Sequence, residues 1–80
     1  MAILRDPRVK DVRFAGGGLE VLLRDGRKIS VPLTWFSKLS SANASDRSIW
    51  EVSAAGYGIH WPLINEDLSV EGLLRAQSAS

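Results

Sequence analysis

Apolar and polar residues alternate along the first forty residues in a pattern that predicts three β-strands. The strands are expected over roughly residues 9–15, 19–24 and 28–33. Two turns separate them, Gly16-Gly17-Gly18 and Asp25-Gly26, and glycine tolerates the positive φ angles that tight hairpins require. The odd-numbered apolar residues would give the meander one buried face, which carries Leu19, Val21, Leu23, Ile29, Val31 and Leu33, while Val12 and Phe14 alternate with Arg13 in the first strand. The register should be firm, because a slip of one residue would turn this apolar set outward.

A sheet with one apolar face must be covered, and the segment after Pro32 has helical spacing. Trp35, Phe36 and Leu39 would share one side of a helix over roughly residues 35–42. Thr34 is placed to cap the N-terminus of this helix. The small polar residues 40–46 predict a loop, in which Ser45 or Asp46 would start one short turn before Arg47.

The second half resumes extended structure and then ends in a helix. Trp50 and Val52 alternate with polar neighbours, residues 54–58 predict a turn, and Ile59-His60-Trp61 predicts another strand that stops at Pro62. The last helix would begin at Asp67 or Ser69, bury Val70, Leu73 and Leu74, and give way to a frayed polar tail at 77–80.

These elements predict an α+β fold. Its mainly antiparallel sheet would consist of a three-stranded meander and a second hairpin, covered by one or two short helices. The 80 residues suffice for one domain, residues 1–80, with an ordered core over about 9–75.

Composition excludes several classes of protein. The sequence has 45% hydrophobic and 24% charged residues, which is typical of a globular domain. It has no apolar run of membrane-spanning length, and Met1 to Arg8 lacks the pattern of a secretory signal, so we expect a cytoplasmic protein that does not insert into a membrane. The absence of cysteine excludes disulfides, cysteine zinc sites and a thiol nucleophile.

The formal net charge of +1 hides an asymmetry between the halves. Residues 1–40 carry a balance of +4 and residues 41–80 a balance of −3. One interpretation is a basic face for nucleic acid, and the other is that the opposite charges intermingle when the halves fold together. A pI near 8.2 favours intermingling, because nucleic-acid-binding domains usually exceed a pI of about 9. The nucleic-acid alternative would use Arg8, Lys10, Arg13, Arg24, Arg27 and Lys28.

The densest group of chemically distinctive residues lies at positions 56–67, which hold the only histidine and the only tyrosine of the chain. His60 with Glu66 or Asp67 could perform general acid–base chemistry, but no nucleophile accompanies them. One imidazole is also too few for a recognisable metal-binding spacing. We therefore expect no metal, no other cofactor and no enzymatic activity, and a small enzyme stays as the weakest alternative. In a purely structural role, His60 would bond to a backbone carbonyl or to one of those two carboxylates.

The three tryptophans can serve the core or an interface, where tryptophan is over-represented. Trp50 alternates cleanly with polar residues and is expected in the core, whereas Trp61, beside Pro62, is the better surface candidate. The predicted interaction site combines aromatic anchors with charge for a basic partner. It consists of Tyr57, His60, Trp61, Glu66 and Asp67.

Three stretches of the chain resemble a small bacterial family, catalogued as domain of unknown function 2442. They are Leu19–Arg27, Leu33–Leu39 with Arg47–Trp50, and Gly58–Pro62 running into Glu66–Val70. The resemblance spans about residues 9–75, and the last stretch is the specific one.

The resemblance implies a compact α+β domain without an established enzymatic activity. It also implies a gene that lies beside that of another small protein, in an arrangement like a toxin–antitoxin pair. The chain departs from the family at Ser37, where proline is frequent, and at Asn65, where an acidic residue is usual. We therefore expect a non-catalytic protein-interaction module, the antitoxin-like or regulatory partner of a nearby-encoded small protein. A homodimer stays open, because short sheets leave edge strands that can pair.

Overall fold

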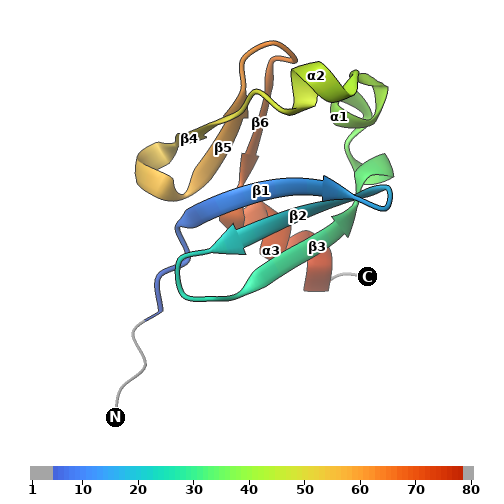
Figure 1. Ribbon diagram of the computed structural model, residues 1–80. Coiled ribbons are helices and arrows are strands. Elements are labelled where there is room, and N and C mark those ends of the chain that lie inside the picture. Colours follow the sequence, from blue (N-terminus) through green and yellow to red (C-terminus); the bar gives the residue numbers. More distant parts are fainter. Residues whose placement is uncertain (1–4, 79–80) are drawn as a thin grey trace.

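The computed structural model describes residues 5–78 as two three-stranded antiparallel sheets joined by short helices (Figure 1). The first sheet has the order β1-β2-β3, with β1 at Val9–Ala15, β2 at Gly18–Leu23 and β3 at Lys28–Pro32. The second has the order β4-β5-β6, with β4 at Glu51–Ser53, β5 at Gly58–Trp61 and β6 at Glu66–Ser69. The expected α+β class and antiparallel pairing are confirmed.

Five helical segments complete the fold. The chain passes from β3 to β4 through the 3-10 helix η1 (Leu33–Trp35), α1 (Ser37–Ser41) and α2 (Ala44–Arg47). A second 3-10 helix, η2 (Ala54–Gly56), joins β4 to β5, and α3 (Val70–Ser78) ends the described chain. In Figure 1 the second sheet stands above the first, α3 lies behind the first sheet, and α1 and α2 lie beside the upper end of the second.

The first sheet follows the alternation of its sequence. Its predicted apolar positions are buried, apart from the half-buried Phe14. The β1–β2 hairpin turns through Gly16 and Gly17, whose φ angles are +57° and +76°. The two-residue turn that matches the twist of antiparallel strands requires a positive φ at both of its central residues. This requirement explains why both positions are glycine.

One hydrophobic core joins the two sheets and α3, and Trp61 lies in it with 0% exposure. Its ring meets the Phe14 ring edge-on, at 6.3 Å between centroids, and its Nε1–H donates to the Arg47 carbonyl at 3.0 Å. Trp61, which the sequence left open between core and surface, is therefore a core residue and not an exposed anchor of the predicted interaction site. Trp61 alternates with His60 along β5 and shares the inward face with Ile59, so Pro62 ends the strand without bringing the indole to the surface.

The predicted helix over residues 35–42 is interrupted. Phe36 is extended, with φ −124° and ψ 91°, and separates η1 from α1. Thr34 lies inside η1 and its side chain caps no helix, and Trp35 is 45% exposed, so neither plays the predicted role. Leu39 is buried as expected.

Part of the predicted loop at residues 40–46 is helical. The Asn43 side chain accepts a hydrogen bond from the Asp46 N–H at 2.7 Å and so caps α2. The predicted turn is present, but it starts at Ala44 after an asparagine cap rather than at Ser45 or Asp46, and it includes Arg47.

The second half contains a strand that the sequence did not indicate. Residues Glu66–Ser69 pair with β5 as β6, although only Leu68 among them is apolar. Ser69 then caps α3, as predicted, by accepting the Gly72 N–H at 2.9 Å. The helix continues to Ser78, so the tail predicted to begin at residue 77 is helical as far as the structure describes it.

None of the helices formed by residues 5–78 is both long enough and apolar enough to cross a bilayer.

Candidate binding groove

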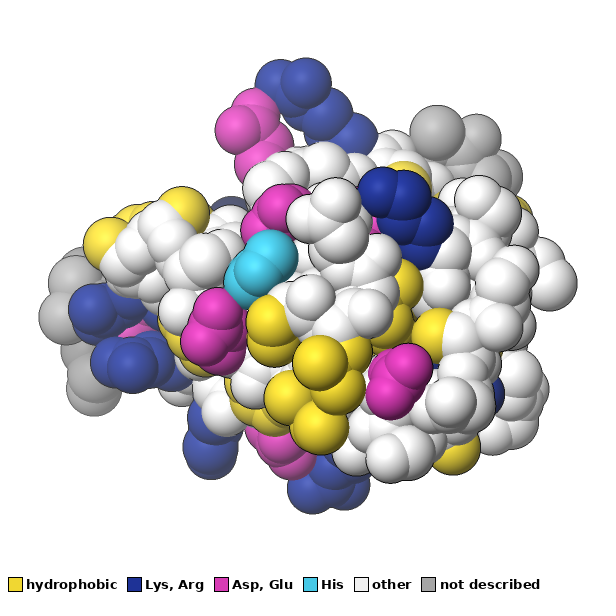
Figure 2. Space-filling model, turned by 90° about the horizontal axis from the view of Figure 1, so that it is seen from above, with side chains coloured by type: hydrophobic (Ala, Val, Ile, Leu, Met, Phe, Trp, Pro, Cys, Tyr) yellow, Lys and Arg dark blue, Asp and Glu magenta, His cyan; other side chains and the backbone are white. Residues whose placement is uncertain are grey.

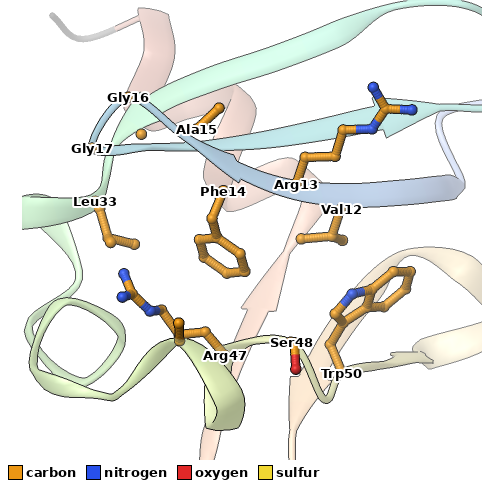
Figure 3. Close-up of a pocket in the computed structure, with 12 residues that line it drawn as sticks. Val12, Arg13, Phe14, Ala15, Gly16, Gly17, Leu33, Arg47, Ser48 and Trp50 are labelled. Atoms are coloured by element: carbon orange, nitrogen blue, oxygen red, sulfur yellow. The ribbon is translucent and has the colours of Figure 1, made fainter.

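A groove of about 830 Å³ separates β1 from the segment that runs from α2 to Trp50 (Figure 3). Val12 and Phe14 enter it from the inner face of β1, and Trp50 lies across from Val12. Trp50 is half-buried rather than fully in the core, because one side of its indole forms this wall. The remaining lining residues are Arg13, Ala15, Gly16, Gly17, Gly18, Leu33, Ala44, Arg47 and Ser48.

Arg47 supplies the charge of the groove. Its guanidinium carbon lies 5.6 Å from the centre of the Phe14 ring, within the range of a cation–π contact. Its Nε is buried and has no hydrogen-bond partner among residues 5–78. Buried polar atoms in folded proteins nearly always have a partner, so this unpartnered N–H is an exception within the described structure.

The sequence reasoning missed this groove. Arg47 stands in a small polar segment and Phe14 in a strand far from it along the chain, and only tertiary packing brings them together. The alternation of β1 marked Phe14 as inward-facing, but nothing local indicated that it would be only half-buried.

Residues 9–78 match the protein family described as "Protein of unknown function (DUF2442)". The chain belongs to the DUF2442 family. The match spans most of the chain and confirms the resemblance seen in its sequence.

Two solved structures share the fold of this DUF2442 domain. A crystal structure of a protein of unknown function from Rhodospirillum rubrum ATCC 11170 is 27% identical, with a TM-score of 0.76, over 90% of this chain and 89% of the other. The solution NMR structure of the uncharacterized protein CV0863 from Chromobacterium violaceum is 21% identical, with a TM-score of 0.75, over 91% of this chain and 69% of the other. No curated protein gives a significant match.

The predicted interaction residues of the DUF2442 domain do not form one site. His60 lies on the outer face of the second sheet, where Glu51 and Asp67 flank it across the neighbouring strands. Trp61 and its partner across the ladder, Glu66, follow on the opposite face.

Tyr57 completes the predicted set, and it lies at the other end of the second sheet. It follows η2, is 49% exposed, and its carbonyl accepts the Val70 N–H at 2.9 Å.

His60 has the structural role that the sequence allowed. Its Nδ1 lies 2.7 Å from Asp67 Oδ1, which ties β5 to β6 on their outer face. Figure 2 shows this histidine between acidic side chains and beside a hydrophobic patch. The exposed Ile49 and Leu63 belong to the same end of the sheet, because Ile49 precedes Glu51 on β4 and Leu63 follows β5.

Most of the predicted basic residues have a carboxylate beside them. The ion pairs are Arg8–Asp6 at 2.8 Å, Arg13–Asp11 at 3.2 Å, Arg27–Asp25 at 2.9 Å and Lys28–Glu20 at 3.6 Å. All four join residues of the first half of the chain. Lys10 and Arg24 are exposed and form no ion pair within residues 5–78.

The Asp6–Arg8 pair also shifts a titration. The Arg8 guanidinium donates to both oxygens of Asp6, at 2.8 Å each, and holds the pKa of that carboxyl at about 2. The hydrogen bond from the Arg27 side chain likewise lowers the pKa of Asp25. Both carboxylates lie at one end of the first sheet and are not part of the groove lining.

Proposed function

We propose that this DUF2442 domain is a non-catalytic protein-interaction module that holds a segment of its partner in the groove between β1 and α2. The observation that carries the proposal is an apolar groove that contains a guanidinium without an ion-pair partner among the described residues. The proposal includes a cytoplasmic location and an antitoxin-like or regulatory role beside a small protein encoded nearby, in line with the gene arrangement that the family resemblance implies.

The lining of the groove supports a protein partner. Phe14, Trp50 and Arg47 bring together two aromatic side chains and an arginine, and tryptophan and arginine are among the residues that dominate binding energy in protein interfaces. Charge complementarity specifies the occupant, because a guanidinium held against an aromatic ring favours a carboxylate. The occupant in this proposal is therefore a partner segment with one acidic side chain among apolar ones.

The ion pairs favour this function over nucleic-acid binding. Four of the six basic residues considered for nucleic acid carry an acidic neighbour within 4 Å, which would repel phosphates as well as neutralise the base. Arg47, in contrast, lies in the groove beside Phe14 and has no carboxylate partner among the described residues.

The test is co-expression of the tagged full chain with the product of the adjacent gene, followed by nuclease treatment and light scattering. We expect a stoichiometric complex that survives nuclease and 0.5 M salt. Failure to form a complex, or its loss with nuclease, would contradict the proposed function.

A matched pair of variants locates the binding site. Trp50→Leu removes the indole of the groove wall and is expected to weaken the complex about tenfold or more, as loss of an interface anchor does. Trp35→Leu makes the same change at an exposed tryptophan outside the groove and should leave the affinity within about twofold. Circular dichroism establishes that both variants are folded. Equal affinities of the two variants would place the interface elsewhere.

A further inference from the structure

The free edge of β1 faces the groove. The β1–β2 hairpin closes on the pair Ala15↔Gly18 across a two-residue turn, so this pair exchanges ladder hydrogen bonds. Hydrogen-bonded and non-bonded pairs then alternate, which makes Arg13↔Glu20 bonded and Phe14↔Leu19 non-bonded. Phe14 therefore directs its N–H and C=O away from β2, toward the unpaired edge.

Further hydrogen bonds agree with this alternation. The alternation directs the backbone groups of odd-numbered β2 residues toward β3. The Leu23 N–H agrees with this, since it donates to the Arg27 carbonyl at 2.8 Å. The alternation directs the backbone groups of even-numbered residues toward β1. The Arg24 N–H agrees with this, since it donates to the Arg8 carbonyl at 2.9 Å.

The backbone N–H and C=O of Val12 also point toward the unpaired edge, but the Val12 N–H already donates a hydrogen bond. It donates to Asp11 Oδ1 at 2.9 Å, beside an irregularity in the pairing between Val9 and Asp11. The edge groups left for another strand are the Val12 C=O and both backbone groups of Phe14, for which residues 5–78 provide no loop or side-chain partner. These groups lie in the stretch of β1 that lines the groove.

The other edge of the first sheet is protected against strand addition. The same alternation directs Lys28, Ser30 and Pro32 of β3 to its outer edge. Pro32 has no N–H to donate, and a charged lysine is a common means of blocking an edge. In β1 the stretch from Val12 to Phe14 has no proline, and its one charged residue, Arg13, is ion-paired with Asp11.

We propose that the partner segment pairs as an added β-strand with β1 at Val12–Phe14, and that an Asp or Glu of this strand binds Arg47. This inference rests on the proposed function and specifies its recognition mode. Backbone hydrogen bonds give such a strand its affinity, and pockets for alternate side chains give it its specificity.

The groove predicts the spacing of the recognised side chains. Trp50 lies opposite Val12, and the Arg47 guanidinium lies over Phe14, two residues farther along β1 (Figure 3). Side chains on one face of a strand recur every second residue. The partner strand should therefore carry an apolar residue toward Trp50 and, two residues away, the carboxylate toward Arg47.

The experiment uses a displayed library of random nonapeptides, panned against the full chain, and then synthetic copies of the enriched peptides. We expect enrichment of an aspartate or glutamate two positions from an apolar residue. Arg47→Gln should weaken binding of such a peptide tenfold or more, and Arg75→Gln, on the far α3, should change it less than twofold. Replacing the acidic residue of the peptide by its amide should cost as much as Arg47→Gln, with little further loss when both changes are combined.

Hydrogen exchange tests the strand itself. Saturating peptide should slow exchange of the Phe14 amide at least tenfold, because that N–H gains an acceptor. The Arg13 amide, already in the ladder, serves as the internal control and should change little. An unchanged Phe14 amide under saturation, or full affinity of Arg47→Gln, would overturn the inference.

The outcomes separate this inference from the proposed function. A nuclease-resistant complex with the adjacent gene product that leaves Phe14 unprotected would retain the interaction module and reject strand addition. A Phe14 amide protected without any peptide, in a chain that light scattering finds dimeric, would make a second copy the occupant and reject the partner strand. Absence of both a complex and an enriched peptide would reject both proposals.

Discussion

The two sheets of this domain differ in how their sequence encodes them. The strands of the first have seven, six and five residues, and β2 and β3 alternate strictly between more and less buried positions, whereas β1 has an irregularity between Val9 and Asp11. The strands of the second have three, four and four residues, and β4 buries none of its side chains fully. The first sheet is thus specified by local pattern, whereas the second depends on what β5 contributes to the shared core.

The turns show the same difference. Every positive φ angle in the turns of the first sheet belongs to a glycine. In the second sheet Ala54, Ala55 and Asn65 adopt φ angles of +51°, +57° and +56°. Such conformations cost a residue with a side chain roughly 1 kcal/mol or more, so packing around the second sheet must offset them.

Truncation of Trp61 should give the largest effect, because this side chain joins the second sheet to the first. Trp61→Ala removes the edge contact with Phe14 and the hydrogen bond to the Arg47 carbonyl. We expect a loss of about 3–5 kcal/mol in the free energy of unfolding, measured by urea denaturation. A domain of this size has only about 4–12 kcal/mol in total, so the variant should be largely unfolded on warming.

The control for this variant is Trp35→Ala, at an exposed indole outside the core. Its free energy of unfolding should stay within about 0.5 kcal/mol of the wild type. Similar losses for the two variants would mean that the second sheet does not depend on its buried tryptophan.

Gly56→Ala tests the opposite end of the junction between the sheets. Gly56 has a φ of +102°, and an added Cβ would lie 2.8–2.9 Å from the Arg8 side chain. We expect a loss of about 1–3 kcal/mol in the free energy of unfolding, from backbone strain together with displacement of Arg8. The matched control is Gly17→Ala, where φ is +76° and no atom lies within 4 Å of the added Cβ, so only the backbone cost applies. A smaller loss at Gly56 than at Gly17 would contradict the close packing of Arg8 between the sheets.

Acidic pH should lower the free energy of unfolding by a smaller amount than these substitutions, through protonation of Asp6, the partner of Arg8. Its folded-state pKa of about 2 is below the ordinary value of 3.8, so the ionised carboxylate is favoured by folding. The resulting stabilisation is fully present above about pH 4 and is lost as the pH falls from about 4 through 2. The urea midpoint should drop over this range, and Asp6→Asn should reduce the drop without abolishing it, because the pKa of Asp25 is also lowered. An unchanged drop in Asp6→Asn would show that the Arg8 pair contributes nothing to this dependence.

The predictability of each region follows from the range of its interactions. The turn at Asp25-Gly26, the Ser69 cap and the bond between His60 and Asp67 join residues close in sequence, and local chemistry indicated all three, although the turn is longer than the two residues that Asp25-Gly26 predicts, because Leu23 bonds to Arg27 across it. Strand β6 escaped prediction because Glu66–Ser69 has a polar composition and becomes a strand only beside β5.

The candidate site was the least predictable part. Its walls come from β1 and α2, and the exposure of Phe14 and Trp50 depends on how far apart the packed elements stand. The sequence could not place Trp61 for a related reason, since proximity to a strand end says little about which face a side chain occupies.

The distribution of the three tryptophans gives the molecule its own fluorescence reporters. Trp61 is buried in the core, Trp35 is 45% exposed, and Trp50 lines the groove. Indole emission moves to shorter wavelength as water leaves the ring, so filling the groove should shift the signal of Trp50 without any attached dye. With Trp35 replaced by phenylalanine, the remaining spectrum separates occupancy of the groove at Trp50 from unfolding at Trp61.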